Sequence, residues 1–353
     1  MGRIMTSNET LPEVPPEAAA MQLLFQLGTG YIASAALQVA LKLELADRFS
    51  SDPMPVDELA RATGVDEDAL YRVMRALASL GLLEEPTPRM FRLTLAGSML
   101  RKGPGSFHDM GLWITSPFHF RVYSEMLHTV TTGRPAAEKV TGMPVFEYLV
   151  ANKDLSEIFN NAMTGFSAGV APAALEVYDF SGIDVLVDVA GGHGMVLTSI
   201  LRQYPGMRGV LFDLPHVIAG SGPVIEAAGV KDRCTTSSGD FFKEVPPGGD
   251  AYIMKHIIHD WDDARAAAIL RNIRRVLDGR PHGKVILLET VLQPGSQPDL
   301  GKLIDLEMLM MPGGRERTEA EFAALFASTG FELARVVPTR SPLSVVEARV
   351  RRA

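Results

Sequence analysis

The chain has 353 residues and a formal net charge of −8; 46% of its residues are hydrophobic and 22% are charged. This length predicts about two domains, each long enough to bury a core, in a globular protein of ordinary composition. The negative charge argues against a general affinity for nucleic acid. No apolar run approaches the ~18 residues that a membrane span needs, and the single cysteine, Cys234, cannot form an internal disulfide. We therefore expect a protein of the reducing cytoplasm, with neither nucleic acid nor a membrane as its partner.

The chain begins with a polar arm and an apolar helix. Residues 1–17 lack the hydrophobic stretch of a signal peptide, and their composition predicts a disordered arm. From residue 18 to residue 49, apolar residues recur at helical spacing. A helix this apolar must be covered, and the sequence leaves open whether the chain's own core or a second subunit covers it.

The next segment has the pattern of a winged helix. A short helix is followed by a second helix that Asp66 caps, and TPRMFRLTLAGSML (87–100) alternates like a small hairpin. This pattern raises the possibility of DNA binding. However, Glu67 and Asp68 stand at the start of the second helix, where bases would be read, and they would repel phosphate. We therefore favour a structural module that pairs subunits or covers a site.

The middle of the chain, from Phe107 to Ala174, is predicted to be mostly helical, with proline and glycine at the breaks. Methionines and aromatic residues recur along it, including Phe159 and Met163. At helical spacing such side chains belong to a core more often than to a pocket. This segment is nevertheless the best source of walls for an aromatic ligand.

Strands and helices alternate after Asp184. The main strand segments are VLVDV, GVLFDL, AYIMKHII and KVILLETVL, with helices near residues 195–203, 217–228, 262–277 and 319–328. Strands separated by helices of this length predict a doubly wound α/β domain with a parallel sheet. The last two segments, FELARVVPT and LSVVEARV, indicate an antiparallel finish at one edge.

A glycine turn follows the first of these strands. Asp188 closes the apolar run of VLVDVAGGHG (185–194), and the glycines allow a close approach of a ligand beside a helix N-terminus. Gly192 and Gly194 match the start of a dinucleotide fingerprint, but Leu197 stands at its third glycine position. The lysine of a phosphate-binding P-loop is also absent. The turn therefore favours a ligand without a bulky polyphosphate.

Two further acids indicate what that ligand is. Asp213 ends the next strand, where a carboxylate can accept hydrogen bonds from ribose hydroxyls. Asp240 ends the third strand beside Phe241, a pairing that suits the exocyclic amine and the flat face of a purine. With Asp188 they would lie at the carboxyl ends of adjacent strands, and together they indicate adenosine.

A series of motifs resembles a known family. DVAGGHG, FDLPHVI, GDFF, MKHIIHDWDD, LLETVL and GGRERTEAEF are similar, in this order, to those of S-adenosylmethionine (SAM)-dependent O-methyltransferases of the caffeic acid and acetylserotonin type. The resemblance implies a Rossmann-like methyltransferase domain at residues 181–353. It further implies a mainly helical, winged-helix-like dimerisation domain at 18–105, a connector lining the substrate pocket at 106–180, and a homodimer formed through the N-terminal domain.

The resemblance implies a binding site for SAM, with S-adenosylhomocysteine (SAH) as the product. The residues it assigns to this cofactor are Asp188, Gly192, Asp213, Asp240, Phe241 and Lys255. Ser167 falls where a hydroxyl meets the carboxylate of the cofactor. Ala190 stands where the family usually has a glycine, so close contact between the backbone and the cofactor is in question there.

The chemistry follows from the same resemblance. A methyl group on a sulfonium is already activated, so the protein must align the acceptor oxygen and remove its proton. A phenol, with a pKa of about 10, suits a neutral histidine as general base. The residues implied as catalytic are His259 and, as partners of its imidazole, Glu289 and Glu316.

The acceptor is expected to be an aromatic small molecule. The residues implied around it are Phe159, Met163, Asp260, Met308 and Met311. His256 falls where the family commonly has an aromatic residue, and we expect it to pack or to face solvent. No group of histidines and acids has the spacing of metal ligands, so no metal is expected.

Other functions stay open. Some relatives with this fold methylate nitrogen or carboxylate, or catalyse hydroxylation without methyl transfer. A SAM-sensing, DNA-binding regulator would use the winged helix instead. His259 with both glutamates disfavours the loss of methyl transfer, and the acidic net charge disfavours the regulator.

Overall fold

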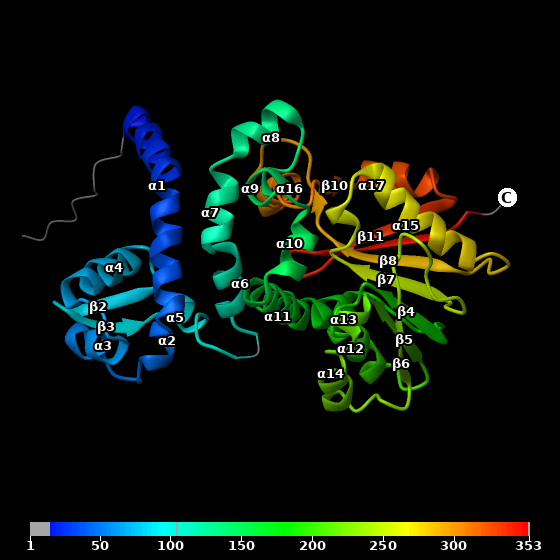
Figure 1. The fold of residues 1–353 in the computed structure, drawn as a ribbon, viewed down its shortest axis with the longest axis horizontal. Helices are drawn as coiled ribbons and strands as arrows, with labels where there is room; N and C mark the ends of the chain where they lie inside the picture. The colour runs from blue at the N-terminus through cyan, green and yellow to red at the C-terminus, as the bar shows by residue number, and fades with distance from the viewer. Residues whose placement is uncertain (1–14, 104, 352–353) are drawn as a thin grey trace, which may run out of the picture. The chain divides into compact units, whose positions relative to one another are not determined.

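The structure, a computed structural model, describes residues 15–103 and 105–351. Within them the chain divides into two compact units after Arg101 (Figure 1). The segment 106–180, predicted as a separate connector, belongs to the same unit as the sheet. Of the predicted arm, residues 1–14 lie outside the described residues, while Pro16 and Glu17 belong to the first helix.

The first unit is a small winged-helix-like fold. Its elements are α1 (Pro16–Lys42), α2 (Leu45–Arg48), β1 (Met54–Pro55), α3 (Val56–Thr63), α4 (Glu67–Ser79), β2 (Leu83–Thr87), β3 (Met90–Leu93) and α5 (Leu95–Ser98). The predicted cap is present, since Asp66 Oδ1 accepts a hydrogen bond from Ala69 N at 2.8 Å. The strands pair antiparallel in the order β1-β3-β2. The hairpin is shorter than predicted, because Thr94 caps α5 and makes Leu95–Ser98 a helix.

Helix α1 carries apolar side chains that its own unit leaves uncovered. Phe25 is 66% exposed and Leu27 is 72% exposed, whereas only Ala40 and Leu41, near the end of the helix, are buried. By length and composition α1 is apolar enough to cross a membrane, so the expectation that no segment approaches this limit is wrong. The same features fit a helix that packs on another protein chain.

The second unit begins with a run of helices. They are α6 (His108–Ile114), α7 (Pro117–Tyr123), α8 (Met126–Thr132), α9 (Ala136–Thr141), α10 (Val145–Ala151) and α11 (Lys153–Val177). The predicted breaks fall at helix ends: Pro117 opens α7, Gly133 follows α8, and Pro144 precedes α10. Because α11 packs against both α6 and α12 (Met195–Gln203), it joins these helices to the sheet.

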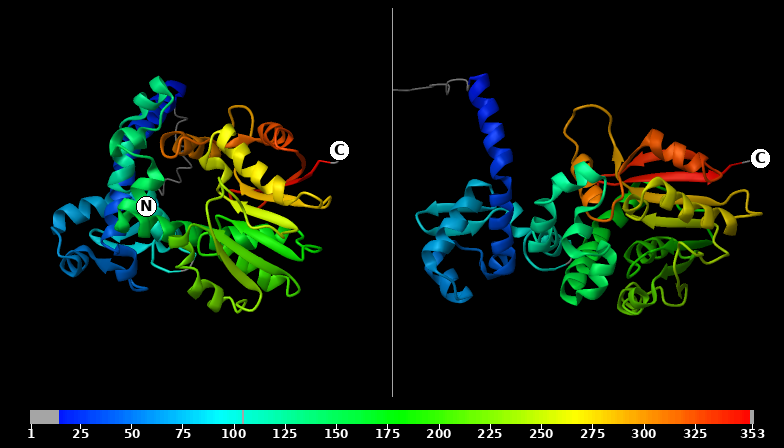
Figure 2. Two further views of the ribbon diagram at one scale, coloured as in Figure 1. Left: turned by 45° about the vertical axis from the view of Figure 1, so that its right-hand side comes forward. Right: turned by 45° about the horizontal axis from the view of Figure 1, so that its top comes forward.

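A seven-stranded sheet forms the centre of the second unit (Figure 2). Its strands are β4 (Val185–Val189), β5 (Arg208–Asp213), β6 (Cys234–Ser238), β7 (Ala251–Lys255), β8 (Lys284–Glu289), β11 (Phe331–Pro338) and β12 (Ser344–Val350), in the order β11-β12-β8-β7-β4-β5-β6. The strands from β8 to β6 are parallel, and β12 pairs antiparallel with β8 and β11. The doubly wound class and the antiparallel finish at one edge are therefore confirmed.

Helices cover both faces of this sheet. Besides α12 they are α13 (Pro215–Ile218), α14 (Gly222–Ala227), α15 (Asp263–Val276) and α17 (Glu319–Ala327). Side chains alternate along β4, so that Leu186 packs with α11 and α12 while Val187 packs with α15 and α17. Figure 1 shows α12 and α15 on opposite sides of the strands. With both faces covered, the carboxyl ends of the strands remain as the place where a ligand binds.

A short helical turn after β7 is held by a loop distant in sequence. The turn is η1 (Ile258–Asp260), and the loop joins α16 (Leu300–Met310) to β10 (Arg317–Thr318), which pairs with β9 (Val291–Leu292). Arg315 N donates a hydrogen bond to His259 O at 2.8 Å. A Cβ atom added to Gly314 would collide with the same carbonyl oxygen, so glycine is required for this approach.

Arg317 completes this contact. Its guanidinium is fully buried and donates hydrogen bonds to Ile258 O at 3.1 Å and to Trp261 O at 2.9 Å. It also donates to Asp263 Oδ1 at 3.0 and 2.8 Å. A buried charge is tolerated only when its hydrogen bonds are made, so Arg317 ties the flanks of η1 to the start of α15. We call residues 258–263 together with residues 313–317 the Arg317 clamp.

The glycine turn after β4 is tightly built. A Cβ atom added to Gly191 would lie 2.5 Å from Cγ of Asp188, so the backbone passes directly over that carboxyl group. Ala190 has a φ of 56°, in the left-handed region that favours glycine. Its N–H donates to Phe212 O at 2.7 Å, which holds the strained conformation in place. The residue that departs from the family pattern thus adopts a conformation that favours glycine.

Ala190→Gly should therefore stabilise the protein. Removing left-handed strain stabilises the protein by about 1–2 kcal/mol. The extra freedom of glycine in the unfolded chain costs about 0.5–1 kcal/mol, which leaves a net gain of up to about 1.5 kcal/mol. Thermal unfolding measures this as a rise in Tm. Ala324→Gly, at an exposed interior position of α17, is the matched control and should lower the Tm. An Ala190→Gly variant as destabilised as this control would contradict the account.

Candidate active site

A cavity of about 430 Å³ lies at the carboxyl ends of the parallel strands. The turns that follow β4, β5 and β7 form one side of it, and α11 contributes to the other. The residues assigned to the cofactor all line this central cavity, namely Asp188, Gly192, Asp213, Asp240, Phe241 and Lys255. The structure thus brings together side chains from strands far apart in the sequence, as expected of parallel strands that end at one edge.

Backbone amides hold two of these carboxylates. Asp213 Oδ2 accepts a hydrogen bond from Gly192 N at 2.8 Å, and its Oδ1 accepts one from Leu214 N at 2.7 Å. Asp240 Oδ1 accepts a hydrogen bond from Phe242 N at 2.9 Å. Both carboxylates are therefore oriented, while each keeps lone pairs for the hydroxyls or amines of a ligand.

Buried carboxyl groups lie close together in the cavity, and a cationic ligand would stabilise their ionised forms. Asp188 Oδ2 is buried without a hydrogen-bond partner, and burial together with the charge of Asp213 raises the pKa of Asp188 to about 7. Burial also raises the pKa of Asp213, and it lowers the pKa of Lys255. A nearby positive charge favours the ionised form of a carboxylate. The cavity residues therefore fit SAM, which carries a sulfonium and an ammonium group.

His259, Glu289 and Glu316 lie together beside the cavity, next to Ile257 and Asp260 of its lining, but none of the three is itself a lining residue. His259 Nδ1 is 2.8 Å from Glu316 Oε1 and 3.9 Å from Glu289 Oε2. Glu289 Oε1 accepts hydrogen bonds from Ile257 N at 3.1 Å and from Ile258 N at 2.9 Å, so it also holds the backbone of η1. When Nδ1–H donates a hydrogen bond to Glu316, Nε2 carries no proton and keeps a free lone pair, which is what a general base requires.

Burial brings the pKa values of the surrounding acids close to neutrality. It raises the pKa of Glu289 to about 7, and burial together with Asp305 raises that of Glu316 to about 8. Asp260 Oδ1 lies 3.5 Å from His259 Nε2, and burial raises the pKa of Asp260 to about 7. A change of charge in the cavity can therefore move protons among these groups near pH 7.

Two residues expected around the acceptor lie elsewhere. The central cavity is lined by Phe159, Met163 and Asp260, but not by Met308 or Met311. Met308 and Met311 are only 9% and 3% exposed. Met311 belongs to the helical core around Trp113, against which Phe159 and Met163 also pack. It therefore supports the cavity wall from behind instead of facing the acceptor, because the end of α16 turns this side chain into the helical core.

The sequence analysis missed most of a polar row on α11. The row that lines the cavity is Ser156, Asn160, Thr164 and Ser167. Ser167 was expected at the cofactor, and its Oγ also donates a hydrogen bond to Met163 O at 2.7 Å. Residues three and four positions apart share a helix face. Extending this spacing from Phe159 and Met163 would have found the other three.

His256 was expected to pack or to face solvent; it packs, and it also lines the central cavity. Its ring lies nearly flat on that of His259, with centroids 4.2 Å apart and planes inclined by 21°. His256, His259 and Glu316 do offer metal-ligand atoms within 4.8 Å of one another. A metal ion lies close to the plane of each imidazole that binds it. Two stacked, nearly parallel rings cannot both reach one ion, so this cluster does not fit a metal centre as it stands.

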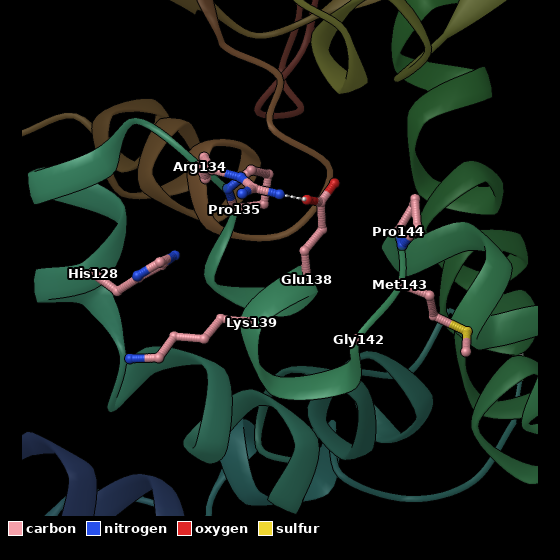
Figure 3. A pocket seen from close by; sticks show the side chains of 8 residues that line it. All are labelled: His128, Arg134, Pro135, Glu138, Lys139, Gly142, Met143 and Pro144. Carbon is pink, nitrogen blue, oxygen red and sulfur yellow. Dashed lines mark ion pairs between the residues drawn. The ribbon is translucent and has the colours of Figure 1, made fainter.

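A second cavity, of about 380 Å³, lies beside α8 and α9 (Figure 3). Its lining includes two cations, each with a carboxylate partner. Arg134 lies 3.6 Å from Glu138, toward which it points in Figure 3, and Lys139 lies 2.6 Å from Glu125. None of the site residues predicted from the sequence lines this cavity. The central cavity is therefore the candidate active site.

Comparisons with known proteins identify the family of the chain. Residues 123–332 match the family model of the O-methyltransferase domain, and residues 25–103 match that of the O-methyltransferase dimerisation domain. The chain is 43% identical to phenazine O-methyltransferase PhzM of Lysobacter antibioticus, over 98% of this chain and 99% of that one. It is 32% identical to 8-amino-8-demethylriboflavin N,N-dimethyltransferase of Streptomyces davaonensis, over 96% of this chain and 98% of that one.

A solved structure supports the same assignment. The chain resembles CalO1, a methyltransferase in calicheamicin biosynthesis solved in its SAH-bound form, with a TM-score of 0.84 and 32% identity. The similarity covers 96% of this chain and 99% of that one. The Rossmann-like sheet and the dimerisation domain predicted from the sequence motifs are thereby confirmed. The chain belongs to the family of SAM-dependent O-methyltransferases that carry an N-terminal dimerisation domain.

Proposed function

We propose that this enzyme moves the methyl group of SAM to a phenolic hydroxyl of an aromatic small molecule, with His259 as general base. The observation that carries the proposal is the environment of His259. Its Nδ1 is bonded to Glu316 and its Nε2 lies beside Asp260, which lines the central cavity. One nitrogen is thus committed to a carboxylate, while the other is available to an acceptor hydroxyl.

The protein's part in the reaction is alignment and proton removal. SAM supplies a methyl group bound to a sulfonium, and that C–S bond breaks as the new O–C bond forms, leaving SAH. The acceptor must be held in line with the methyl group. His259 Nε2 takes the hydroxyl proton, and the resulting imidazolium is stabilised by Glu316 and by the more distant Glu289.

The proposed cofactor contacts follow from the atoms that the cavity offers. Asp213 accepts hydrogen bonds from the ribose hydroxyls, and Asp240 with Phe241 holds the adenine. The turn at Gly192 and the unpartnered carboxylate oxygen of Asp188 serve the methionine end. Lys255 lines the same cavity. The family pattern assigns it to the adenine region.

The proposed acceptor is a flat aromatic molecule. Large aromatic side chains line the cavity from α10, α11 and the Arg317 clamp, namely Phe146, Phe159 and Trp261. Flat rings gain contact area when stacked on such walls. The relative of 43% identity is named for phenazines, which are flat and tricyclic. Hydroxylated phenazines are therefore the first acceptors to test.

Methylation of nitrogen is the second candidate. It is favoured by the relative named as an N,N-dimethyltransferase. A neutral amine is nucleophilic before it loses a proton, so its methylation would not depend on His259 as base. The glutamates around His259 favour a hydroxyl acceptor, because they stabilise the imidazolium that forms when His259 takes the acceptor's proton as the methyl group is transferred.

We propose that the reaction needs no metal and that the partners include neither nucleic acid nor a membrane. The stacked rings of His256 and His259 argue against a metal ion, because two nearly parallel rings cannot both ligate one ion. In the winged-helix-like unit, Glu67 at the start of α4 is paired with Arg89, and the exposed Asp68 beside it adds a negative charge where DNA would be read. Cys234 is free and buried, as suits a reducing cytoplasm.

We also propose a homodimer formed through the first unit. Its support is the match to the dimerisation domain and the uncovered apolar side chains of α1. Covering such side chains gains about 25 cal/mol per Å² of apolar surface. A second copy of the same helical unit would provide that cover without a membrane.

Phe25→Glu should shift the dimer toward monomers, because a charge would enter the apolar interface. Light scattering at a fixed protein concentration measures the mass. Gln26→Glu is the matched control, since its side chain points about 100° away around the helix, and it should leave the dimer intact. A wild-type protein that is monomeric by this measurement would remove the proposal.

His259→Ala should abolish methyl transfer while leaving cofactor binding intact. Transfer of a tritiated methyl group from SAM to a panel of phenols, flavonoids, hydroxyphenazines and polyketide-type aromatics should fall by at least roughly a hundred-fold. Calorimetry should still show SAH binding, because His259 is not among the residues that line the cavity. His282→Ala, at an exposed position, is the control and should keep the wild-type rate.

Two outcomes would contradict the proposal. Full transfer to a hydroxyl by the His259→Ala variant would remove the base role. The absence of any heat when wild-type protein is mixed with SAH would remove the cofactor assignment. Undiminished transfer to aromatic amines alone would favour the second candidate.

A further inference from the structure

His256 belongs to a column of flat groups that ends on His259. One face of its imidazole lies on His259, and the other lies on Phe166, with centroids 5.2 Å apart and planes inclined by 17°. Lys255 Nζ lies 5.5 Å from the centre of the Phe166 ring, so the column is closed by a cation–π contact. The proposed base is therefore the last ring of a stack that starts on α11.

The stack supplies a restraint that hydrogen bonding alone does not. His259 has one close hydrogen bond, from Nδ1 to Glu316. The outer torsion of a histidine side chain has a broad energy profile, so a single bond leaves the ring able to tilt about the bond axis. A flat surface against the face of the ring prevents that tilt. Tilting would move Nε2 away from the acceptor, and a misplacement of about 1 Å can cost on the order of a hundred-fold in rate.

The imidazole of His256 makes no hydrogen bond to any residue that the structure describes, and its Nε2 is buried. Its ring contacts are instead with Phe166 and His259, and the residue also borders the central cavity. Burial and the neighbouring His259 hold the pKa of His256 well below its usual range, so it adds no charge beside the base. His256 also has a φ of 53°, a left-handed conformation that is unfavourable for a side chain of this size. Such strain persists where the surrounding structure enforces it.

We propose that His256 is a positioning residue for methyl transfer: its ring, wedged between Phe166 and His259, fixes the plane of the base and couples it to α11. Phe159, Met163 and Phe166 follow one another at spacings of four and three, so they share one face of that helix. Phe159 and Met163 line the cavity. An acceptor bound against this face of α11 therefore contacts the same helix that supports the stack behind the base. This inference rests on the proposed role of His259.

The test compares flat and non-flat replacements of His256. His256→Phe keeps a flat ring but has no nitrogen, and His256→Leu has a similar bulk without a flat face. With a hydroxyphenazine as acceptor and saturating SAM, we expect kcat of the Phe variant within about three-fold of the wild type. We expect the Leu variant to lose at least roughly ten-fold in kcat, with a smaller change in KM. SAH affinity by calorimetry should be equal in the two variants.

A further variant tests whether a loss of kcat comes from misfolding. His256→Asn tolerates the left-handed conformation but is too small to cover the ring, so it should resemble the Leu variant in kcat while keeping the wild-type Tm. Phe166→Leu, which removes the support behind His256, should lower kcat in the same direction.

A Leu variant as fast as the Phe variant would overturn the inference, because the base would then need no flat surface against it. So would a Phe variant as slow as the Leu variant, because a polar role of His256 would then replace the positioning role. Failure of the proposed function is distinguishable from either result. In that case His259→Ala itself would retain transfer, whatever the His256 series shows.

Discussion

The active site depends on one buried cation, the guanidinium of Arg317. It donates hydrogen bonds to the carbonyl oxygens of Ile258, at the start of η1, and of Trp261, just after it. Leaving a buried carbonyl such as that of Trp261 unpaired would cost about 1–3 kcal/mol. The same loop approaches His259 closely because Gly314 has no side chain. It also carries Glu316, which bonds the His259 ring. One loop thus holds both the backbone and the side chain of the proposed base.

The sheet order places this loop opposite the cofactor residues. The chain leaves β4 toward β5 on one side and returns to β7 and β8 on the other, so the carboxyl ends of β4 and β7 open a crevice between them. Asp188 and Asp213 come from one side of this crevice, while His259 and Glu289 come from the other. Glu289 reaches across from β8 to bind the backbone of η1. The proposed donor and base are therefore held by adjacent strands, not by independent loops.

Much of this arrangement could be predicted, and the limits have physical causes. Alternating strands and helices predict a doubly wound sheet, and parallel strands must end at one edge, so the convergence of Asp188 and Asp213 follows from the sequence. Whether Met311 faces the cavity or the core depends on how α16 packs, which helical periodicity does not determine. What buries the apolar side chains of α1 also depends on packing, so helical periodicity does not determine it. The stacking of His256 depends on a left-handed backbone at that residue, a conformation that residues other than glycine adopt only uncommonly, so the sequence alone does not predict it.

The central claim is that Glu316, presented by the Arg317 clamp, makes His259 a base toward the acceptor. The most direct measurement is kcat for methyl transfer by Glu316→Gln at saturating SAM, together with SAH affinity and Tm. Glutamine keeps the size of the side chain and a hydrogen-bond acceptor for Nδ1, but it removes the charge that stabilises the imidazolium. The account predicts a loss of at least roughly ten-fold in kcat, with SAH affinity and Tm close to those of the wild type. A variant that transfers methyl groups at the wild-type rate would contradict it.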